Sequence, residues 1–110
     1  NSLKRLKIKV SNEQNIAILG AAALYYNTTG DDNTAFGDQA LTSNTTGNDN
    51  TASGSYALLS NTTGSKNTAS GHQALYSNID GTQNTASGYY SLRANTTGDN
   101  NTAVGYRAMN

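Results

Sequence analysis

One string returns along the chain at a fixed step of seventeen positions. It reads NTAFG from Asn33, NTASG from Asn50, Asn67 and Asn84, and NTAVG from Asn101. The full unit is N-T-A-x-G-x-x-A-L-x-S-N-T-T-G-x-x, and it keeps its register without insertion or deletion. Self-similarity at a fixed period indicates a repeat architecture, and a disordered chain would not hold that register. The repeat therefore constrains the fold more than any other feature of the 110 residues.

The fixed positions of the repeat are small, apolar or turn-forming, whereas the variable positions are polar or aromatic. Apolar residues that return at one position meet when repeats stack, so they predict the interior. The predicted core residues are Ala35, Ala40, Leu41, Ala52, Ala57, Leu58, Ala69, Ala74, Leu75, Ala86, Leu92 and Ala103. Asn and Gly tolerate positive φ and favour turns, and stacked asparagines predict a ladder of amide hydrogen bonds. The predicted turn and ladder residues are Gly37, Gly54, Gly71, Gly88, Asn44, Asn61, Asn78 and Asn95.

A 17-residue unit is too short for most helical repeats, which need about 30 residues or more. We therefore expect an all-β fold, a parallel β-solenoid or β-roll, with coils about 4.8 Å apart. Each coil would carry two short strands, Thr-Ala-x-Gly and x-x-Ala-Leu-x. Burying a leucine gives roughly 1.5–3 kcal/mol, while fixing one residue's backbone costs roughly 1–2 kcal/mol. So thin a core favours self-association, with the apolar columns facing a shared axis.

The chain divides into two segments of different character. Residues 15–110 hold about six repeats, and because the last copy stops mid-repeat at Asn110 we expect a fragment of a longer protein. In residues 1–14, Leu6, Ile8 and Val10 alternate with lysines, which is typical of a half-buried strand. Four of the seven basic residues lie in this segment. The segment predicts a basic strand that caps or connects the solenoid, and phosphate or lipid binding is the alternative.

Composition excludes several classes of function. The chain has no Cys, so it has neither a disulfide framework nor a thiol nucleophile. Its formal net charge is zero, which removes the usual electrostatic argument for nucleic acid. No apolar run is long enough to span a bilayer. We expect no nucleic-acid partner, no membrane insertion and no cofactor.

Titratable side chains give little support for catalysis or metal binding. His72 is the only histidine and occupies a variable position, and no recurring nucleophile and acid accompany it as a catalytic base would require. Asp31, Asp32, Asp49 and Asp99 lie near the second glycine, where carboxylates can ligate calcium. That corner varies between copies, however, so we expect neither a metal site nor an enzyme.

Two further patterns have both a structural and a functional interpretation. The Asn-Thr-Thr strings that begin at Asn27, Asn44, Asn61 and Asn95 are formal glycosylation acceptors, but an asparagine ladder would use the same string. Aromatic residues in the variable columns either pack against another chain or stack on sugars. The candidate recognition residues are Tyr56, His72, Tyr76, Tyr89, Tyr90 and Tyr106.

The recurring NTAxGxxALxSNTTG string resembles the repeats of phage and phage-like tail-fibre proteins. More distantly it is similar to the YadA-like head of trimeric autotransporter adhesins, a left-handed β-roll with a shorter unit built around an S-V-A-I-G strand. The nearest echo of that strand is Asn15-Ile16-Ala17-Ile18-Leu19-Gly20. The resemblance implies an extracellular homotrimer, on a virion tail fibre or a bacterial surface, that spaces or presents contacts to a host receptor or glycan. It carries over no catalytic residue.

Two other functions stay open. A solenoid that binds ice or another crystal surface would use the regular array of Thr34, Thr51, Thr68, Thr85 and Thr102, with Ser53, Ser70 and Ser87 in the neighbouring column. A solenoid polysaccharide lyase or hydrolase would need acids and bases clustered on one face, which the scattered aspartates do not predict.

Overall fold

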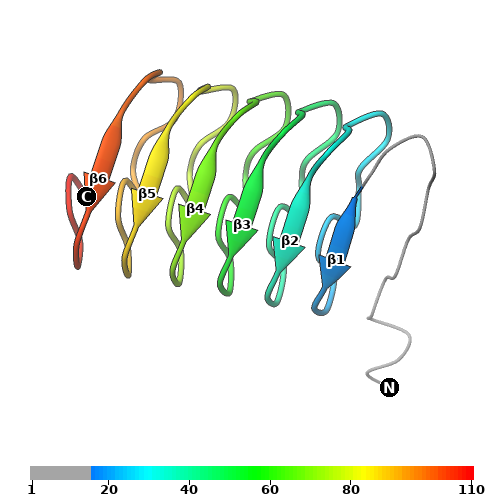
Figure 1. Ribbon diagram of the computed structural model, residues 1–110, viewed down its shortest axis with the longest axis horizontal. Helices are drawn as coiled ribbons and strands as arrows, with labels where there is room; N and C mark the ends of the chain where they lie inside the picture. The colour runs from blue at the N-terminus through cyan, green and yellow to red at the C-terminus, as the bar shows by residue number, and fades with distance from the viewer. Residues whose placement is uncertain (1–15) are drawn as a thin grey trace.

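The computed structural model describes residues 16–110, which form one stack of coils, a parallel β-solenoid (Figure 1). Each coil contributes one strand of three residues to a six-stranded parallel sheet whose order follows the chain. The strands are β1 (Ala17–Leu19), β2 (Thr34–Phe36), β3 (Thr51–Ser53), β4 (Thr68–Ser70), β5 (Thr85–Ser87) and β6 (Thr102–Val104). The all-β solenoid predicted from the repeat is confirmed. The predicted basic strand in residues 1–14 lies outside the described residues.

The strand register equals the sequence period. Thr34 pairs with Thr51, and Ala35 with Ala52, each one repeat further along the chain. The divergent first copy follows the same rule, because Ala17 pairs with Thr34. Each residue of a strand therefore lies beside its equivalent in the next coil. Residues that recur at one position of the repeat form a row along the stack.

The predicted second strand was wrong, because the Ala-Leu segment turns instead of extending. The Ala40 N–H donates to the Gly37 carbonyl at 3.2 Å, and the Thr42 N–H to the Gln39 carbonyl at 3.3 Å, which closes two successive β-turns. The third residue of each turn has positive φ, 56° at Gln39 and 53° at Leu41, as in type II turns. Neither residue is Gly or Asn, so the sequence gives no signal for this backbone.

The turning segment is nevertheless bonded to both neighbouring coils. The Gln39 N–H donates to the Ala21 carbonyl of the preceding coil at 2.8 Å, and the Leu41 N–H to the Ala57 carbonyl of the next at 3.0 Å. Further along each coil, three consecutive N–H groups, those of Thr28, Thr29 and Gly30, converge on the Thr45 carbonyl at 3.1 Å each. Backbone hydrogen bonds therefore join the coils well beyond the sheet.

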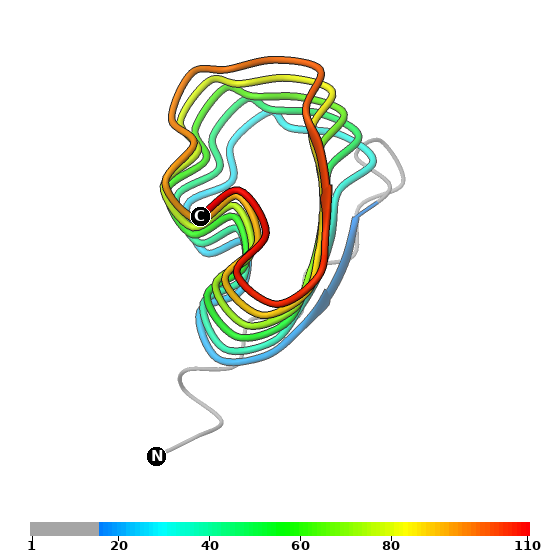
Figure 2. The same cartoon turned by 90° about the vertical axis from the view of Figure 1, so that its left-hand side faces the viewer.

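The interior of the solenoid is filled by its alanine and leucine columns. Every predicted core residue is at most 4% exposed, and Leu41, Leu58 and Leu75 are fully buried. Figure 2 looks along the stack and shows the coils lying over one another around this interior. The expectation that these columns face an axis shared between chains was wrong, because a single chain already buries the predicted core residues to 4% exposure or less.

The asparagine ladder is confirmed. The Nδ2 of Asn61 donates to the Asn44 Oδ1 at 2.9 Å, and the Nδ2 of Asn78 to the Asn61 Oδ1 at 2.9 Å. The same Asn61 Nδ2 also donates to the carbonyl of Gly64, three residues later. A second asparagine column works differently, since the Asn50 backbone N–H donates to the Asn33 Oδ1 at 3.0 Å. Within residues 16–110, every buried side-chain nitrogen and oxygen has a hydrogen-bond partner.

The second glycine of each repeat is required by close approach, not by backbone conformation. A Cβ at Gly64 would lie 2.4 Å from both the Asn61 Oδ1 and the Gly81 carbonyl oxygen. Positive φ at that corner falls instead on Lys66, at 61°. The first glycine meets both demands: Gly71 has a φ of 129°, and a Cβ there would lie 2.6 Å from the Gly88 carbonyl oxygen.

Candidate functional site

Aromatic rings gather at the corner that follows the strands. His72, Tyr89 and Tyr106 occupy the same position in successive coils, directly after the glycine that follows each strand. The rings of His72 and Tyr89 stack with centroids 5.5 Å apart, and those of Tyr89 and Tyr106 with centroids 5.3 Å apart. We call the set of Tyr56, His72, Tyr89, Tyr90 and Tyr106 the aromatic corner.

The other two members widen this column of rings. Tyr90 stacks on its neighbour Tyr89 with centroids 4.0 Å apart and an interplanar angle of 15°. Tyr56 meets His72 edge-on at 5.9 Å. The rings stay partly open to solvent, with Tyr89 40% and Tyr106 71% exposed. The aromatic corner is therefore a continuous surface with exposed ring area.

The solenoid backbone fixes the positions of these rings. Coils repeat at the strand spacing of about 4.8 Å, which is within the range of favourable aromatic contacts, so rings in one column must meet. The Tyr90 N–H donates to the His72 carbonyl at 3.0 Å, and the Arg107 N–H to the Tyr89 carbonyl at 2.7 Å. The corner is thus preorganised by its own chain.

Two arginines complete the surface. The Arg93 guanidinium lies 4.8 Å from the Tyr90 centroid and 5.2 Å from that of Tyr76, within cation–π range. The Arg107 guanidinium lies 5.4 Å from the Tyr90 ring and 5.7 Å from the Tyr106 ring. Arg93 thereby connects Tyr76 to the corner. The six predicted recognition residues form one surface, although the sequence prediction omitted both arginines.

The repeat itself holds the signal that was missed. Arg93 lies one repeat after Tyr76, and Arg107 lies one repeat after Tyr90. Each arginine therefore replaces a tyrosine of the preceding coil and must lie over its ring. Reading the variable columns along the stack, in addition to the fixed ones, would have identified both.

The Tyr89 phenol is perturbed by its neighbours. Its pKa is raised above the ordinary value, chiefly by a side-chain hydrogen bond with Tyr90, then by desolvation and by the nearby phenols of Tyr90 and Tyr106, while Arg107 opposes the shift. The raised pKa keeps the Tyr89 phenol protonated, and so able to both donate and accept hydrogen bonds, to a higher pH than an ordinary tyrosine.

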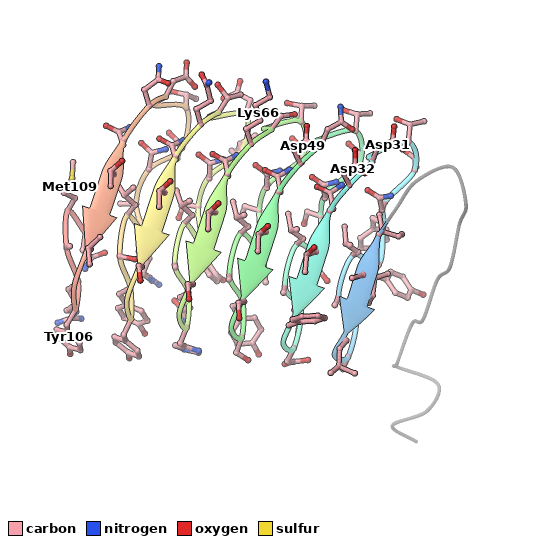
Figure 3. The ribbon with its side chains drawn as sticks, viewed as in Figure 1. Asp31, Asp32, Asp49, Lys66, Tyr106 and Met109 are labelled. Carbon is pink, nitrogen blue, oxygen red and sulfur yellow. The ribbon has the colours of Figure 1, made fainter. Side chains whose placement is uncertain are left out.

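The aspartates flanking the second glycine lie at the opposite edge from the aromatic corner. Figure 3 shows Asp31, Asp32, Asp49 and Lys66 along one edge of the stack and Tyr106 along the other. At the aspartate edge, side chains bond between coils, as where the Asp31 N–H donates to the Asn48 Oδ1 at 2.8 Å. In residues 16–110 no three acidic or histidine side chains lie close enough together to hold a metal ion.

The outer side of the sheet carries the predicted threonine array. Thr51, Thr68, Thr85 and Thr102 are exposed on successive strands, while the alanine between the outward residues of each strand points into the core. We call this surface the sheet face. Its second column is less regular, since Phe36 is 45% and Val104 is 73% exposed there.

The glycosylation strings lie in the asparagine ladder. Asn44 and Asn61 are fully buried and Asn27 is 6% exposed, so their amides are closed to modification in the folded chain. Asn95 is half-buried, and its Nδ2 donates to the Asn78 Oδ1 at 2.9 Å. The structure therefore favours the structural interpretation of these strings.

The fold and its surface define the protein as a β-solenoid that carries an aromatic corner. Comparison with protein-family models, with curated proteins and with solved structures gave no match. No helix capable of crossing a bilayer occurs in the part of the chain that the structure describes.

Proposed function

We propose that this chain is a structural and adhesive segment of an extracellular surface fibre, not an enzyme, and that its aromatic corner contacts a glycan or receptor on a host surface. The observation that carries the proposal is the unbroken stack of His72, Tyr89 and Tyr106 on a hydrogen-bonded scaffold. Tyrosine offers a large apolar face together with a polar hydroxyl group, and that combination suits the faces and hydroxyls of sugars. A rigid surface also loses little conformational entropy on binding.

The class of fibre is proposed from the repeat. Its resemblance to tail-fibre and adhesin repeats supports a homotrimer on a phage tail or a bacterial surface. Because the Ala and Leu columns are enclosed within one chain, three copies would meet through outer columns. Sedimentation equilibrium across a wide concentration range tests this. A mass of three chains is expected, and a persistent monomer would contradict the trimer without touching the aromatic corner.

Binding by the aromatic corner is tested separately. We expect the chain to bind host cells or immobilised glycans, and the double variant Tyr89→Ala with Tyr106→Ala to lose at least about tenfold in affinity. Tyr26→Ala is the matched control, since Tyr26 is 60% exposed but pairs with Tyr25 away from the corner. Equal binding by wild type and double variant, or no binding to any glycan or cell, would overturn the proposal.

A second function is favoured by the sheet face. Regularly spaced threonine hydroxyls on consecutive strands would suit a flat, ordered surface such as ice or another crystal. Thermal hysteresis at millimolar protein, lost in a variant with Thr68→Lys and Thr85→Lys, would support this function. Freezing behaviour indistinguishable from that of an inert protein would remove it.

A further inference from the structure

We infer that the ligand of the aromatic corner is an anionic polysaccharide, whose carboxylate or sulfate groups pair with Arg93 and Arg107 while its sugar faces lie on the rings. The inference rests on the proposed glycan-binding function and adds the charge of the ligand. Its basis is the placement of the two guanidinium groups and of the acids within residues 16–110.

Both guanidinium groups are held in place by the corner and keep donors for a ligand. Arg93 donates through Nε to the Gln73 Oε1 at 2.7 Å, which orients its side chain and leaves the terminal nitrogens. Within residues 16–110, the Arg107 guanidinium has ring contacts and no hydrogen bond or ion pair. An arginine stacked on a ring presents its N–H edge outward, and that edge matches a carboxylate or sulfate in two parallel hydrogen bonds.

The two arginines share one ring. Both guanidinium groups lie within 5.4 Å of the Tyr90 centroid, although they come from successive coils. An anionic group placed near Tyr90 would therefore be attracted by both guanidinium groups. A neutral sugar would use neither charge, which makes a purely neutral ligand a poor match for this surface.

Charges are segregated between the two edges of the stack. Five acids lie within two residues of the second glycine of a repeat: Asp31, Asp32, Asp49, Asp80 and Asp99. Figure 3 shows the first three at the edge opposite Tyr106. Asp38 is the one acid in the column of His72, two coils before it. Among the side chains of residues 16–110, none of the six carboxylates lies in the corner from His72 to Arg107, and the two arginines give this part of the surface a positive potential.

This segregation also orients the ligand. An anionic chain that crossed the coil would approach the aspartate edge and be repelled. One that follows the stack from His72 toward Tyr106 stays on rings and meets both arginines. We therefore place the polysaccharide along the stack, with one sugar face against successive rings.

The test centres on two polymers that share a backbone and differ in the charge of their carboxyl groups. Polygalacturonate and its fully methyl-esterified form have the same sugar backbone, and only the first has free carboxylates. Hyaluronate and heparin add a second carboxylate polymer and a sulfated one, with dextran and mannan as neutral probes. Binding is followed by calorimetry and by tyrosine fluorescence, which is usable because the chain has seven Tyr and no Trp.

The variants isolate the arginines. We expect at least one anionic polymer to bind at least about tenfold more tightly than the neutral probes. Arg93→Gln with Arg107→Gln should abolish that preference, and added salt should weaken it. Lys66→Gln is the matched control, because it removes a positive charge from the opposite edge, and it should change nothing. Circular dichroism confirms that each variant is folded.

Each contrary result has its own meaning. Equal binding to anionic and neutral polymers, lost in Tyr89→Ala but kept in the double arginine variant, would overturn the anionic ligand and keep the glycan-binding function. Anionic binding that survives the double arginine variant would overturn the assigned residues. Binding to no polymer in the panel would overturn the anionic polysaccharide as ligand, while the separate host-cell assay decides the adhesive function.

Discussion

The Asn61 Nδ2 lies 2.9 Å from the Asn44 Oδ1 one coil earlier, and both side chains are fully buried. The same Nδ2 donates to the Gly64 carbonyl at 2.9 Å, so one amide group links two coils and closes its own turn. Unpaired buried polar groups are costly, and this ladder therefore commits every coil to the same geometry.

Removing one amide of the ladder should be expensive. Asn61→Ala leaves the buried Asn44 Oδ1 without its donor, whereas the Gly64 carbonyl keeps its hydrogen bond from the Asn50 Nδ2. One unsatisfied buried acceptor costs about 1–3 kcal/mol, so we expect a loss of at least about 1 kcal/mol in unfolding free energy, measured by urea denaturation. Thr63→Ala, two residues away at an exposed position, should stay within about 0.5 kcal/mol. Similar losses in both variants would contradict a structural ladder.

Alanine substitutions at two glycines of one column distinguish the cost of backbone strain from the cost of a steric clash. At Gly105 a Cβ would meet only the Ala108 Cβ, at 3.9 Å, so Gly105→Ala should cost about 1–3 kcal/mol from its φ of 125°. Gly71→Ala adds a clash with the next coil, 2.6 Å from a carbonyl oxygen, and we expect a loss above about 4 kcal/mol or failure to fold. Thermal melts followed by circular dichroism compare the two variants. Equal stability would contradict the close approach of neighbouring coils at Gly71.

The leucine column should tolerate substitutions of similar volume only when the new side chain is not β-branched. Leu58 is fully buried with a φ of 52°, a region that β-branched residues strongly avoid. Leu58→Met should cost less than about 1.5 kcal/mol, since Met109 occupies the same column with a φ of 53°. We expect Leu58→Ile to cost more than the methionine variant in urea denaturation.

A neighbouring leucine provides the control. Leu59 is half-buried and is not among the residues with positive φ, so Leu59→Ile should be mild. If Leu58→Ile and Leu59→Ile lower the unfolding free energy equally, Leu58 does not have a left-handed backbone conformation.

The Tyr89 phenol should ionise late. The difference in absorbance between wild type and Tyr89→Phe during alkaline titration isolates this group, and its midpoint should lie above 10.0 because the hydrogen bond with Tyr90 raises the pKa. Because the folded-state pKa is raised, the stabilisation is complete below the unfolded pKa of about 10 and is lost as pH rises through the folded value. Tyr90→Phe should return the midpoint toward 10, and an unchanged midpoint would exclude the hydrogen bond as its cause.

Most of the fold that could be predicted from the sequence follows from the 17-residue period. Strand register, the Ala and Leu core and the asparagine ladder all follow once equivalent residues stack. The second strand failed because Gln39 and Leu41 adopt positive φ through neighbouring turns and hydrogen bonds between coils, and neither residue type indicates that conformation. Arg93 and Arg107 were missed because their function comes from the tyrosine one coil earlier.

Convergence of the Thr28, Thr29 and Gly30 N–H groups on one carbonyl of the next coil gives the stack a direction. Other N–H groups, such as that of Gln39, donate to the preceding coil, and each donor meets its acceptor only when neighbouring coils are offset by one whole repeat. Deleting residues 51–67 would join Asn50 to Thr68 and leave each contact type intact, whereas losing one residue fewer would break every column at once. The length of this solenoid can therefore change only in whole coils, and each coil gained or lost also lengthens or shortens the row of rings available to a polymer.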